Sequence, residues 1–371
     1  MSATAVQQVS AKNTTKRFYR PELDLLRLLA FALVFLAHGP RLGHSSVSWR
    51  QALFAAYNNG AHSGIYGLCL FFFLSSYLIT ELLLREQETT GTVHLASFYR
   101  RRILRIWPLY YLAVGLSALC PLLFPDSRFN RHQILYLLLF VGYLGKTFPG
   151  NPFGVLWSIS VEELFYALWP WLVRWGRTTL IWVSLGLIVL SLFIGTSQRE
   201  IWYNPLAHFL FFAGGALTAL WLHGRSWQRS RAWRIGAGGI GLLAMWGIPY
   251  CYLWPSFVAN PLSFLSALGC CLLLFLAIFD LSLPDHWTIR SLLYLGRISY
   301  GLYVFHLFCY SLVRHFLVSH FAAGRAIDLV LVQVPSMVLT IVLAALSYRY
   351  WERPFLRLKE RFTFVRSRDT A

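Results

Sequence analysis

Two ionisable side chains, Arg27 and His38, lie about three helical turns apart in the almost wholly apolar run RPELDLLRLLAFALVFLAHG. At about 100° per residue they return to within roughly 20° of one helix face, with Asp24 close to the same stripe. Ionisable side chains inside a membrane span are costly and usually face a bundle interior or an aqueous cavity. We therefore expect Arg27 and His38 to be buried and functional. The alternative is an interfacial arginine and a hydrogen-bonded histidine near the other surface.

A second group of charges lies in FYRRRILRIWPLYYL, at 98–112, where a basic loop enters an apolar run. Arg102 and Arg105 are at i and i+3, and therefore share one helix face. Guanidinium groups bind phosphate through paired hydrogen bonds. The pair suits a phosphorylated donor such as a coenzyme A thioester, and plain anchoring by a basic loop is the alternative.

Two adjacent carboxylates, Glu162 and Glu163, lie within VLWSISVEELFYALWPW. Glu162 shares a helix face with Ser158 and Tyr166, each one turn away. A carboxylate in such apolar surroundings needs a partner. We expect Glu162 to pair with a histidine or an arginine in the site, or alternatively to form a purely structural ion pair.

A fourth polar group lies in YLGRISYGLYVFHLF, at 294–308. Ser299, Tyr303 and His306 follow i, i+4, i+7 spacing and line one helix face. His306 alone is typical of a satisfied core histidine. Together with Tyr303, and with His38 elsewhere in the bundle, it predicts the lining of a cavity.

The composition indicates an integral membrane protein built as an all-α helical bundle. Hydrophobic residues make up 57% and charged residues only 13% of the 371, whereas soluble chains carry about 25% charged residues. The net charge of +18 comes from short loops and tails, where basic residues mark the cytoplasmic side and meet anionic lipid. It therefore does not indicate nucleic-acid binding.

The basic clusters predict about ten transmembrane helices, with both termini in the cytoplasm. The chain would then be a multi-pass protein of the cell (inner) membrane. The candidate spans are the apolar runs near 23–43, 62–84, 104–124, 133–148, 154–173, 179–195, 203–222, 234–253, 261–281, 291–318 and 327–350. The run at 133–148 has a short apolar core followed by PGNPFG, so we expect 133–153 not to cross. This gives a cytoplasmic tail at 1–20, a transmembrane domain at 21–355 and a second cytoplasmic tail at 356–371.

The six cysteines lie in or beside apolar runs and show no Cys/His ligand spacing. Packing is the role that we expect for them. The sequence therefore predicts neither a metal site nor a tightly bound cofactor.

Six segments resemble the acyltransferase 3 family, in the order in which that family shows them. They are LDLLRLLAFALVFLAHG, FFFLSSYLI, RRILRIWPLYY, WSISVEELFY, LGRISYGLYVFH and SYRYWERPF, and the likeness covers about 20–355. The second segment departs from the family by having Ser76 in place of the usual glycine. Members move acyl groups, most often acetyl from acetyl-CoA, onto saccharides of surface glycans and sometimes onto antibiotics.

The resemblance implies that His38 is the catalytic histidine, that Arg27 supports it, and that Arg102 and Arg105 belong to the RxxR motif of the family. We accordingly expect acyl transfer from acyl-CoA, as co-substrate, to a hydroxyl of a saccharide, glycan or lipid-linked sugar. His38 would act as a general base, or would itself be acylated first, and Glu162 would orient it. The rival prediction is a transporter or flippase of a lipid-linked saccharide or amphipathic solute, with the buried charges as a proton relay.

Overall fold

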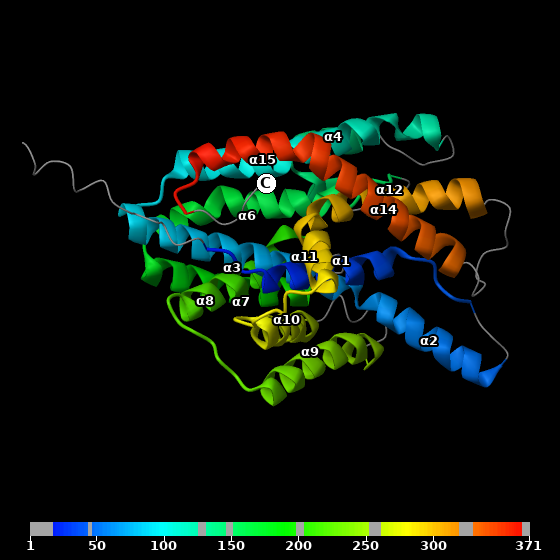
Figure 1. Cartoon of the computed structure of the whole chain (residues 1–371), viewed down its shortest axis with the longest axis horizontal. Helices are drawn as coiled ribbons and strands as arrows, with labels where there is room; N and C mark the ends of the chain where they lie inside the picture. Colours follow the sequence, from blue (N-terminus) through cyan, green and yellow to red (C-terminus); the bar gives the residue numbers. More distant parts are fainter. Residues whose placement is uncertain are drawn as a thin grey trace, which may run out of the picture.

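The computed structural model (Figure 1) describes residues 18–43, 47–124, 131–145, 151–197, 204–251, 261–318 and 329–365. Every regular element in these ranges is a helix, so the predicted all-α fold is confirmed for this part of the chain. Beside the elements introduced below, the helices are α2 (Ser48–His62), α7 (Arg177–Ser197), α9 (Arg231–Cys251), α10 (Pro261–Ile278) and α14 (Val334–Ser347).

Three helices form the centre of the bundle: α1 (Glu22–His38), α3 (Gly64–Thr90) and α8 (Pro205–Leu222). Their backbones approach closely because glycines lie at the contacts. A Cβ on Gly67 would overlap the carbonyl oxygen of Ala30, and one on Gly215 would overlap that of Phe73. Small residues of this kind allow membrane helices to gain van der Waals contact that larger side chains would prevent.

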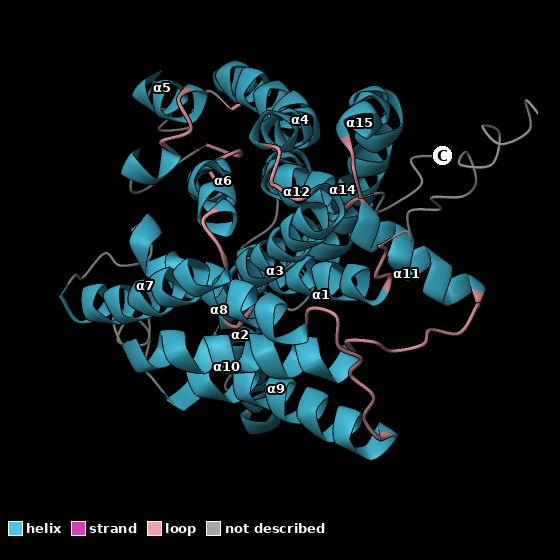
Figure 2. Ribbon diagram, turned by 90° about the vertical axis from the view of Figure 1, so that its left-hand side faces the viewer, coloured by secondary structure: helices cyan, strands magenta, loops and turns pink. Residues whose placement is uncertain are grey.

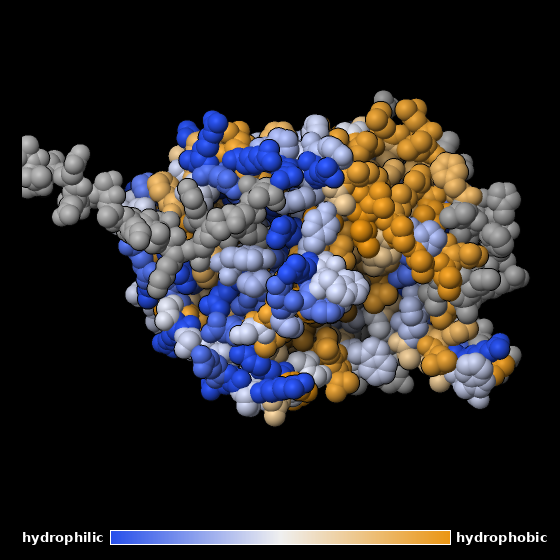
Figure 3. Space-filling model, in the orientation of Figure 1, coloured by the Kyte–Doolittle hydropathy of each residue, from blue (hydrophilic) through white to orange (hydrophobic). Residues whose placement is uncertain are grey.

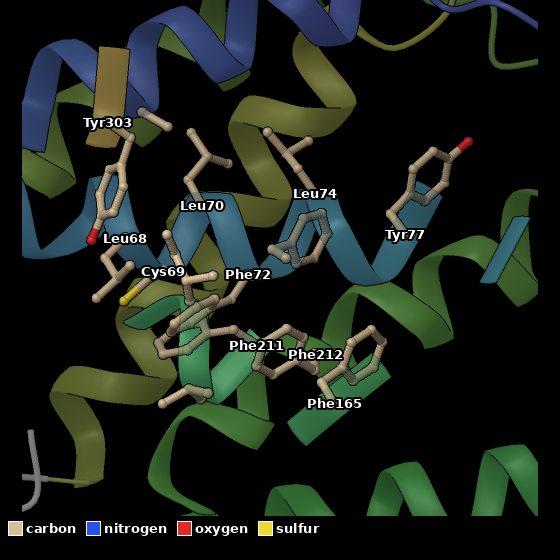
Figure 4. Close-up of a cluster of buried hydrophobic side chains, with 14 of the residues drawn as sticks. Leu68, Cys69, Leu70, Phe72, Leu74, Tyr77, Phe165, Phe211, Phe212 and Tyr303 are labelled. Carbon is tan, nitrogen blue, oxygen red and sulfur yellow. The ribbon is translucent and has the colours of Figure 1, made fainter. Parts of the chain in front are cut away.

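A layer of aromatic side chains joins α3 and α8 to α6 (Leu156–Arg174). Phe212 lies 4.8 Å from Phe72 and 4.3 Å from Phe165 between ring centroids, and it stacks on Phe165. Figure 4 shows these rings converging beneath the leucines of α3. Such aromatic packing fixes α6, and with it the Ser158 to Tyr166 face, against the centre of the bundle.

The outer helices form two opposite edges. Along one edge, α4 (Leu95–Leu123) lies beside α15 (Arg353–Lys359), while α9 and α10 pair at the other edge (Figures 1 and 2). Between them, α11 (Trp287–Arg297) meets α12 (Ser299–Val313) at a bend of 73°. The bend carries α11 across the start of α1, and this packs Gly296, the residue before Arg297, against the backbone of Asp24.

Five helical segments of the described part are long and apolar enough to cross a membrane, or six if the bent α11–α12 pair is one span. They are Ser48–Thr90, Leu95–Leu123, Arg177–Ile194, Pro205–Leu222 and Val330–Phe362. This agrees with a polytopic membrane bundle, whereas the count of ten spans stays a prediction. Hydrophilic side chains gather towards one end of the molecule and apolar ones over the opposite part (Figure 3).

The segment expected not to cross contains only short elements where it is described. Helix α5 (Arg131–Leu138) has 8 residues and is followed by the 3₁₀ turn η1 (Gly142–Gly145). A helix of this length rises about 12 Å, far less than the roughly 30 Å of a hydrocarbon core. The hydroxyl of Tyr110 in α4 fixes α5 in place by donating a hydrogen bond to the carbonyl of Leu137 at 2.7 Å.

A charged cluster joins the end of α8 to the end of α3. His223 directly follows α8, and its two ring nitrogens lie 2.8 Å from carboxylate oxygens of Glu81 and Glu88. The hydrogen bond with Glu81, assisted by that with Glu88, raises the pKa of His223 above its usual value. The two contacts of His223 therefore hold the end of α8 against the last part of α3.

Candidate active site

A cavity opens among α1, α3, α4, α6 and α12 and contains most of the side chains that the sequence singles out. Its wall includes Arg27, Arg102, Arg105, Ser158, Glu162, Tyr166, Ser299 and Tyr303. Its cationic wall residues are Arg20, Arg27, Arg102, Arg105, Arg297 and Lys359. Glu162 is the one carboxylate in the described wall, so positive charge dominates the cavity.

Three of these arginines have no carboxylate partner in the part of the chain that the structure describes. Arg102, Arg105 and Arg297 form no ion pair among the residues that the structure describes. The Nε atoms of Arg102 and Arg297 are buried and lack a hydrogen-bond partner there. Because burying an unpaired guanidinium is costly, the wall suits a ligand with several anionic oxygens.

Arg27 differs from these arginines because it is already paired. Its guanidinium donates to the fully buried Asp24, one turn earlier on α1, at 3.0 Å. The side chain lines the cavity, as its position on the helix stripe predicts. The structure shows no direct contact between Arg27 and His38, so any support that Arg27 gives to His38 is indirect.

Glu162 lies in the same cavity wall as the arginines, and its described partner is Tyr166. Its carboxylate accepts a hydrogen bond from Tyr166, and the guanidinium of Arg102 lies 5.4 Å from the Tyr166 ring centroid. The predicted shared face of Glu162, Ser158 and Tyr166 is found in the cavity wall. The predicted coupling of Glu162 to His38 is not found, because His38 is not part of this wall.

Glu163 points out of the cavity wall, as its position about 100° around the helix implies. It accepts from the indole of Trp107 at 3.4 Å, and its Oε1 is buried without a partner in the described part. The two neighbouring carboxylates therefore lie in different surroundings.

A pair of hydroxyl groups, from Ser158 and Tyr303, belongs to the cavity wall. The Oγ of Ser158 lies 2.7 Å from the hydroxyl of Tyr303, and it also donates to the carbonyl of Val155 at 2.9 Å. The Tyr303 ring packs edge-on to Phe71, with centroids 5.7 Å apart, and Figure 4 shows it reaching towards α3. Beyond Tyr303 lies a pair of histidines.

The two histidines are in direct contact, and their hydrogen bonds define one arrangement of protons. His306 Nδ1 lies 2.6 Å from the carbonyl oxygen of Tyr303, and His38 Nδ1 lies 2.8 Å from that of Val34. A carbonyl only accepts, so both Nδ1 atoms carry hydrogen. His306 Nε2, 3.3 Å from His38 Nδ1, is then an acceptor in the neutral pair. His38 is left with an unprotonated Nε2.

The expectation that His38 is buried is wrong for the residue as a whole. His38 is the last residue of α1 and is exposed, whereas the buried histidine is His306. Neither ring lies in the cavity wall, so the prediction that His306 lines the cavity is also wrong. The helix ends at His38, and Gly39 continues in extended backbone, so the His38 ring keeps its contact with His306 while the residue is exposed.

The sequence predicts only Arg102 and Arg105 as the donor-binding arginines. In the structure Arg297 lines the same cavity wall as these two residues. Its placement depends on Gly296, where a Cβ would overlap the backbone oxygen of Asp24. The glycine that precedes the arginine in LGRISYG was the available signal. Only the bend between α11 and α12 brings this position to α1.

Among the residues that the structure describes, no three His, Cys, Asp or Glu side chains are grouped so that they could hold a metal ion. The described cysteines, Cys69, Cys120, Cys270, Cys271 and Cys309, are buried free thiols. Ser76, the departure from the family pattern, donates to the carbonyl of Phe212 and so joins α3 to α8.

Comparison with known proteins agrees with the family resemblance seen in the sequence. The model of the acyltransferase 3 family, described as an acyltransferase domain, matches residues 20–349. The chain belongs to this family.

Among curated relatives, it is 27% identical over 384 residues to the peptidoglycan O-acetyltransferase OatA of Listeria monocytogenes, covering 92% of this chain and 57% of that protein. It is 24% identical over 368 residues to the O-acetyltransferase OatA of Staphylococcus aureus, covering 91% and 57%. The chain thus spans somewhat over half the length of these relatives. No solved structure matches it.

Proposed function

We propose that this chain is a membrane O-acyltransferase that moves an acyl group, with acetyl as first choice, from acyl-CoA to a hydroxyl of a saccharide or glycan. The observation that carries the proposal is a cavity wall with three arginines that lack an ion pair in the described part, together with Tyr303, whose backbone carbonyl contacts His306 of the His306–His38 pair. The family membership supports acyl transfer, and the relatives' names support O-acetylation of a glycan such as peptidoglycan.

Coenzyme A fits the charge of the cavity. Its phosphates offer many anionic oxygens, and the guanidinium forks of Arg102, Arg105 and Arg297 match them. The hydroxyl of Tyr166 donates to Glu162 in the cavity wall, and the guanidinium of Arg102 lies 5.4 Å from the centroid of the same Tyr166 ring. In this arrangement Glu162 serves the donor site and is not the partner of His38.

His38 acts on the acceptor through its unprotonated Nε2. It removes the proton of the acceptor hydroxyl as the oxygen attacks the thioester carbonyl; the new C–O bond forms, the C–S bond breaks, and the proton leaves on the thiol of coenzyme A. Such a base contributes about 10²–10⁴ in rate. The histidine can instead carry the acyl group itself before passing it to the hydroxyl, and both routes use the same nitrogen.

Tyr303 belongs to both the cavity wall and the histidine pair. Its side chain lines the cavity, and its backbone carbonyl lies 2.6 Å from His306 Nδ1, so in this proposal the acyl group reaches His38 past Tyr303. The exposed end of α1 is the acceptor side in this arrangement, and the cavity mouth is the donor side. We place the donor side and both termini in the cytoplasm, because the basic clusters follow the positive-inside rule.

The experiment uses membranes that contain the protein, acetyl-CoA labelled in the acetyl group, and the N-acetylglucosamine trimer chitotriose as probe acceptor. We expect label on the sugar, in amounts that follow protein level. Movement of the sugar across sealed vesicles without any labelling would instead support the transporter.

A further inference from the structure

Gln333 has a buried carboxamide that nothing in the described part of the structure satisfies. Both its Oε1 and its Nε2 are buried without a hydrogen-bond partner. Buried amides are nearly always paired, because an unpaired one loses its hydrogen bonds to water without replacement. A buried polar group that lacks a partner therefore calls for an explanation.

The carboxamide lies directly against the residue that follows His38. A Cβ on Gly39 would overlap Gln333 Oε1 and would lie 3.1 Å and 3.2 Å from its Cδ and Nε2. The backbone of Gly39, with φ −69° and ψ 171°, is open to any residue. The space beside Gly39 is taken by the amide of Gln333, and a side chain at residue 39 would displace that flexible amide.

The backbone that carries Gln333 is firmly placed. Gln333 ends η4 (Leu329–Gln333), a five-residue π-helical turn, and such turns occur frequently at functional sites. Its neighbour Val332 belongs to the same buried cluster as Phe31 and Phe35 of α1. The unsatisfied amide is thus held at the His38 end of α1 by apolar packing.

We infer that Gln333 binds the acceptor: its carboxamide hydrogen-bonds hydroxyl groups of the saccharide and holds the reacting hydroxyl at His38. A carboxamide offers both donors and an acceptor, and a hydroxyl group offers both as well. Rotation about its last side-chain bond is soft, so the amide can turn from Gly39 to an incoming sugar. This inference rests on the proposed function, since it assigns the acceptor site of the same reaction.

The test compares wild type with Gln333→Leu in purified protein, with Gln133→Leu as the matched control. Gln133 of α5 also has a buried amide oxygen without a partner in the described part, but it lies outside the cavity and the histidine pair. The measurements are the KM values for chitotriose and for acetyl-CoA, the thermal midpoint, and chitotriose binding by tryptophan fluorescence.

Gln333→Leu should raise the KM for chitotriose about tenfold or more, since the sugar hydroxyl loses its partner. The KM for acetyl-CoA should stay within about twofold, and the thermal midpoint should not fall, because an unsatisfied amide has been removed. Gln133→Leu should leave all three values unchanged. Gly39→Ala, which displaces the carboxamide, should shift the KM for chitotriose in the same direction.

A lower midpoint in Gln333→Leu would contradict the inference, because the amide would then have a partner in the folded protein. If the wild type transfers acetyl groups and Gln333→Leu keeps the wild-type KM for chitotriose, the inference fails while the proposed function stands. If the wild type transfers nothing, binding decides. Weaker binding of chitotriose by Gln333→Leu supports the acceptor site, and equal or absent binding in both proteins overturns it.

Discussion

Replacing Arg102 with glutamine tests the donor site most sharply. The guanidinium lines the cavity, its Nε is buried without a partner in the described part, and it forms no ion pair there. A hydrogen bond to a charged group contributes about 1.5–3 kcal/mol, so the loss of its contact with a phosphate should raise the KM for acyl-CoA by about 10- to 150-fold. Arg102→Lys keeps the positive charge but loses the planar guanidinium, so its KM for acyl-CoA should lie between those of the wild type and Arg102→Gln.

The matched control for this variant is Arg100→Gln. Arg100 belongs to the same basic run of α4 but is exposed, lies over the Phe362 ring at 5.2 Å, and is absent from the cavity wall. Its KM for acyl-CoA should change by less than about twofold, as expected of a screened surface charge. Initial rates in inside-out membrane vesicles at varied acyl-CoA provide the comparison. If the KM for acyl-CoA changes equally in the two variants, or does not change in Arg102→Gln, the arginines of this basic run do not bind the donor and only fix the orientation of the protein in the membrane.

Three further predictions concern other parts of the molecule. Glu162→Gln should lose most activity through a higher KM for acyl-CoA, whereas Glu163→Gln should have a mild effect. The measurement is the kinetics of both variants, normalised to the amount of protein in the membrane. A larger loss of activity in Glu163→Gln than in Glu162→Gln would contradict this prediction. Gly296→Ala should lower the thermal midpoint, because the overlap with the Asp24 backbone costs about 1–3 kcal/mol; a wild-type midpoint would refute the close contact. The raised pKa of His223 adds stability that is fully present below its unfolded-state pKa and is lost as pH rises through the folded-state value. The thermal midpoint should therefore fall with rising pH near neutrality, and His223→Gln should flatten that dependence.

The parts of the site that lie on one helix could be predicted from the sequence. Helical spacing alone puts Glu162 and Tyr166 on one face, and the structure has them in contact. The same is true of Arg102 and Arg105 in the cavity wall. These predictions need only the helix period, which the apolar runs fix.

What could not be predicted is how faces of different helices meet. The partner of His38 is His306, set by the packing of α12 on α1, and Glu162 lies elsewhere. The exposure of His38 depends on where α1 ends, and Gly39 gave only a weak signal for that. Gln333 carried no signal at all, because its meaning lies in the contact with Gly39.

The central claim is that acyl transfer from a donor on one side of the membrane to an acceptor on the other depends on His38, and one measurement in sealed inside-out vesicles tests it. Acetyl-labelled acetyl-CoA is supplied outside the vesicles and chitotriose is enclosed within, for wild type and for His38→Ala at matched protein levels. The account predicts label on the enclosed sugar with wild type and a loss of at least about 10²-fold with His38→Ala. Near-wild-type labelling by His38→Ala would contradict it.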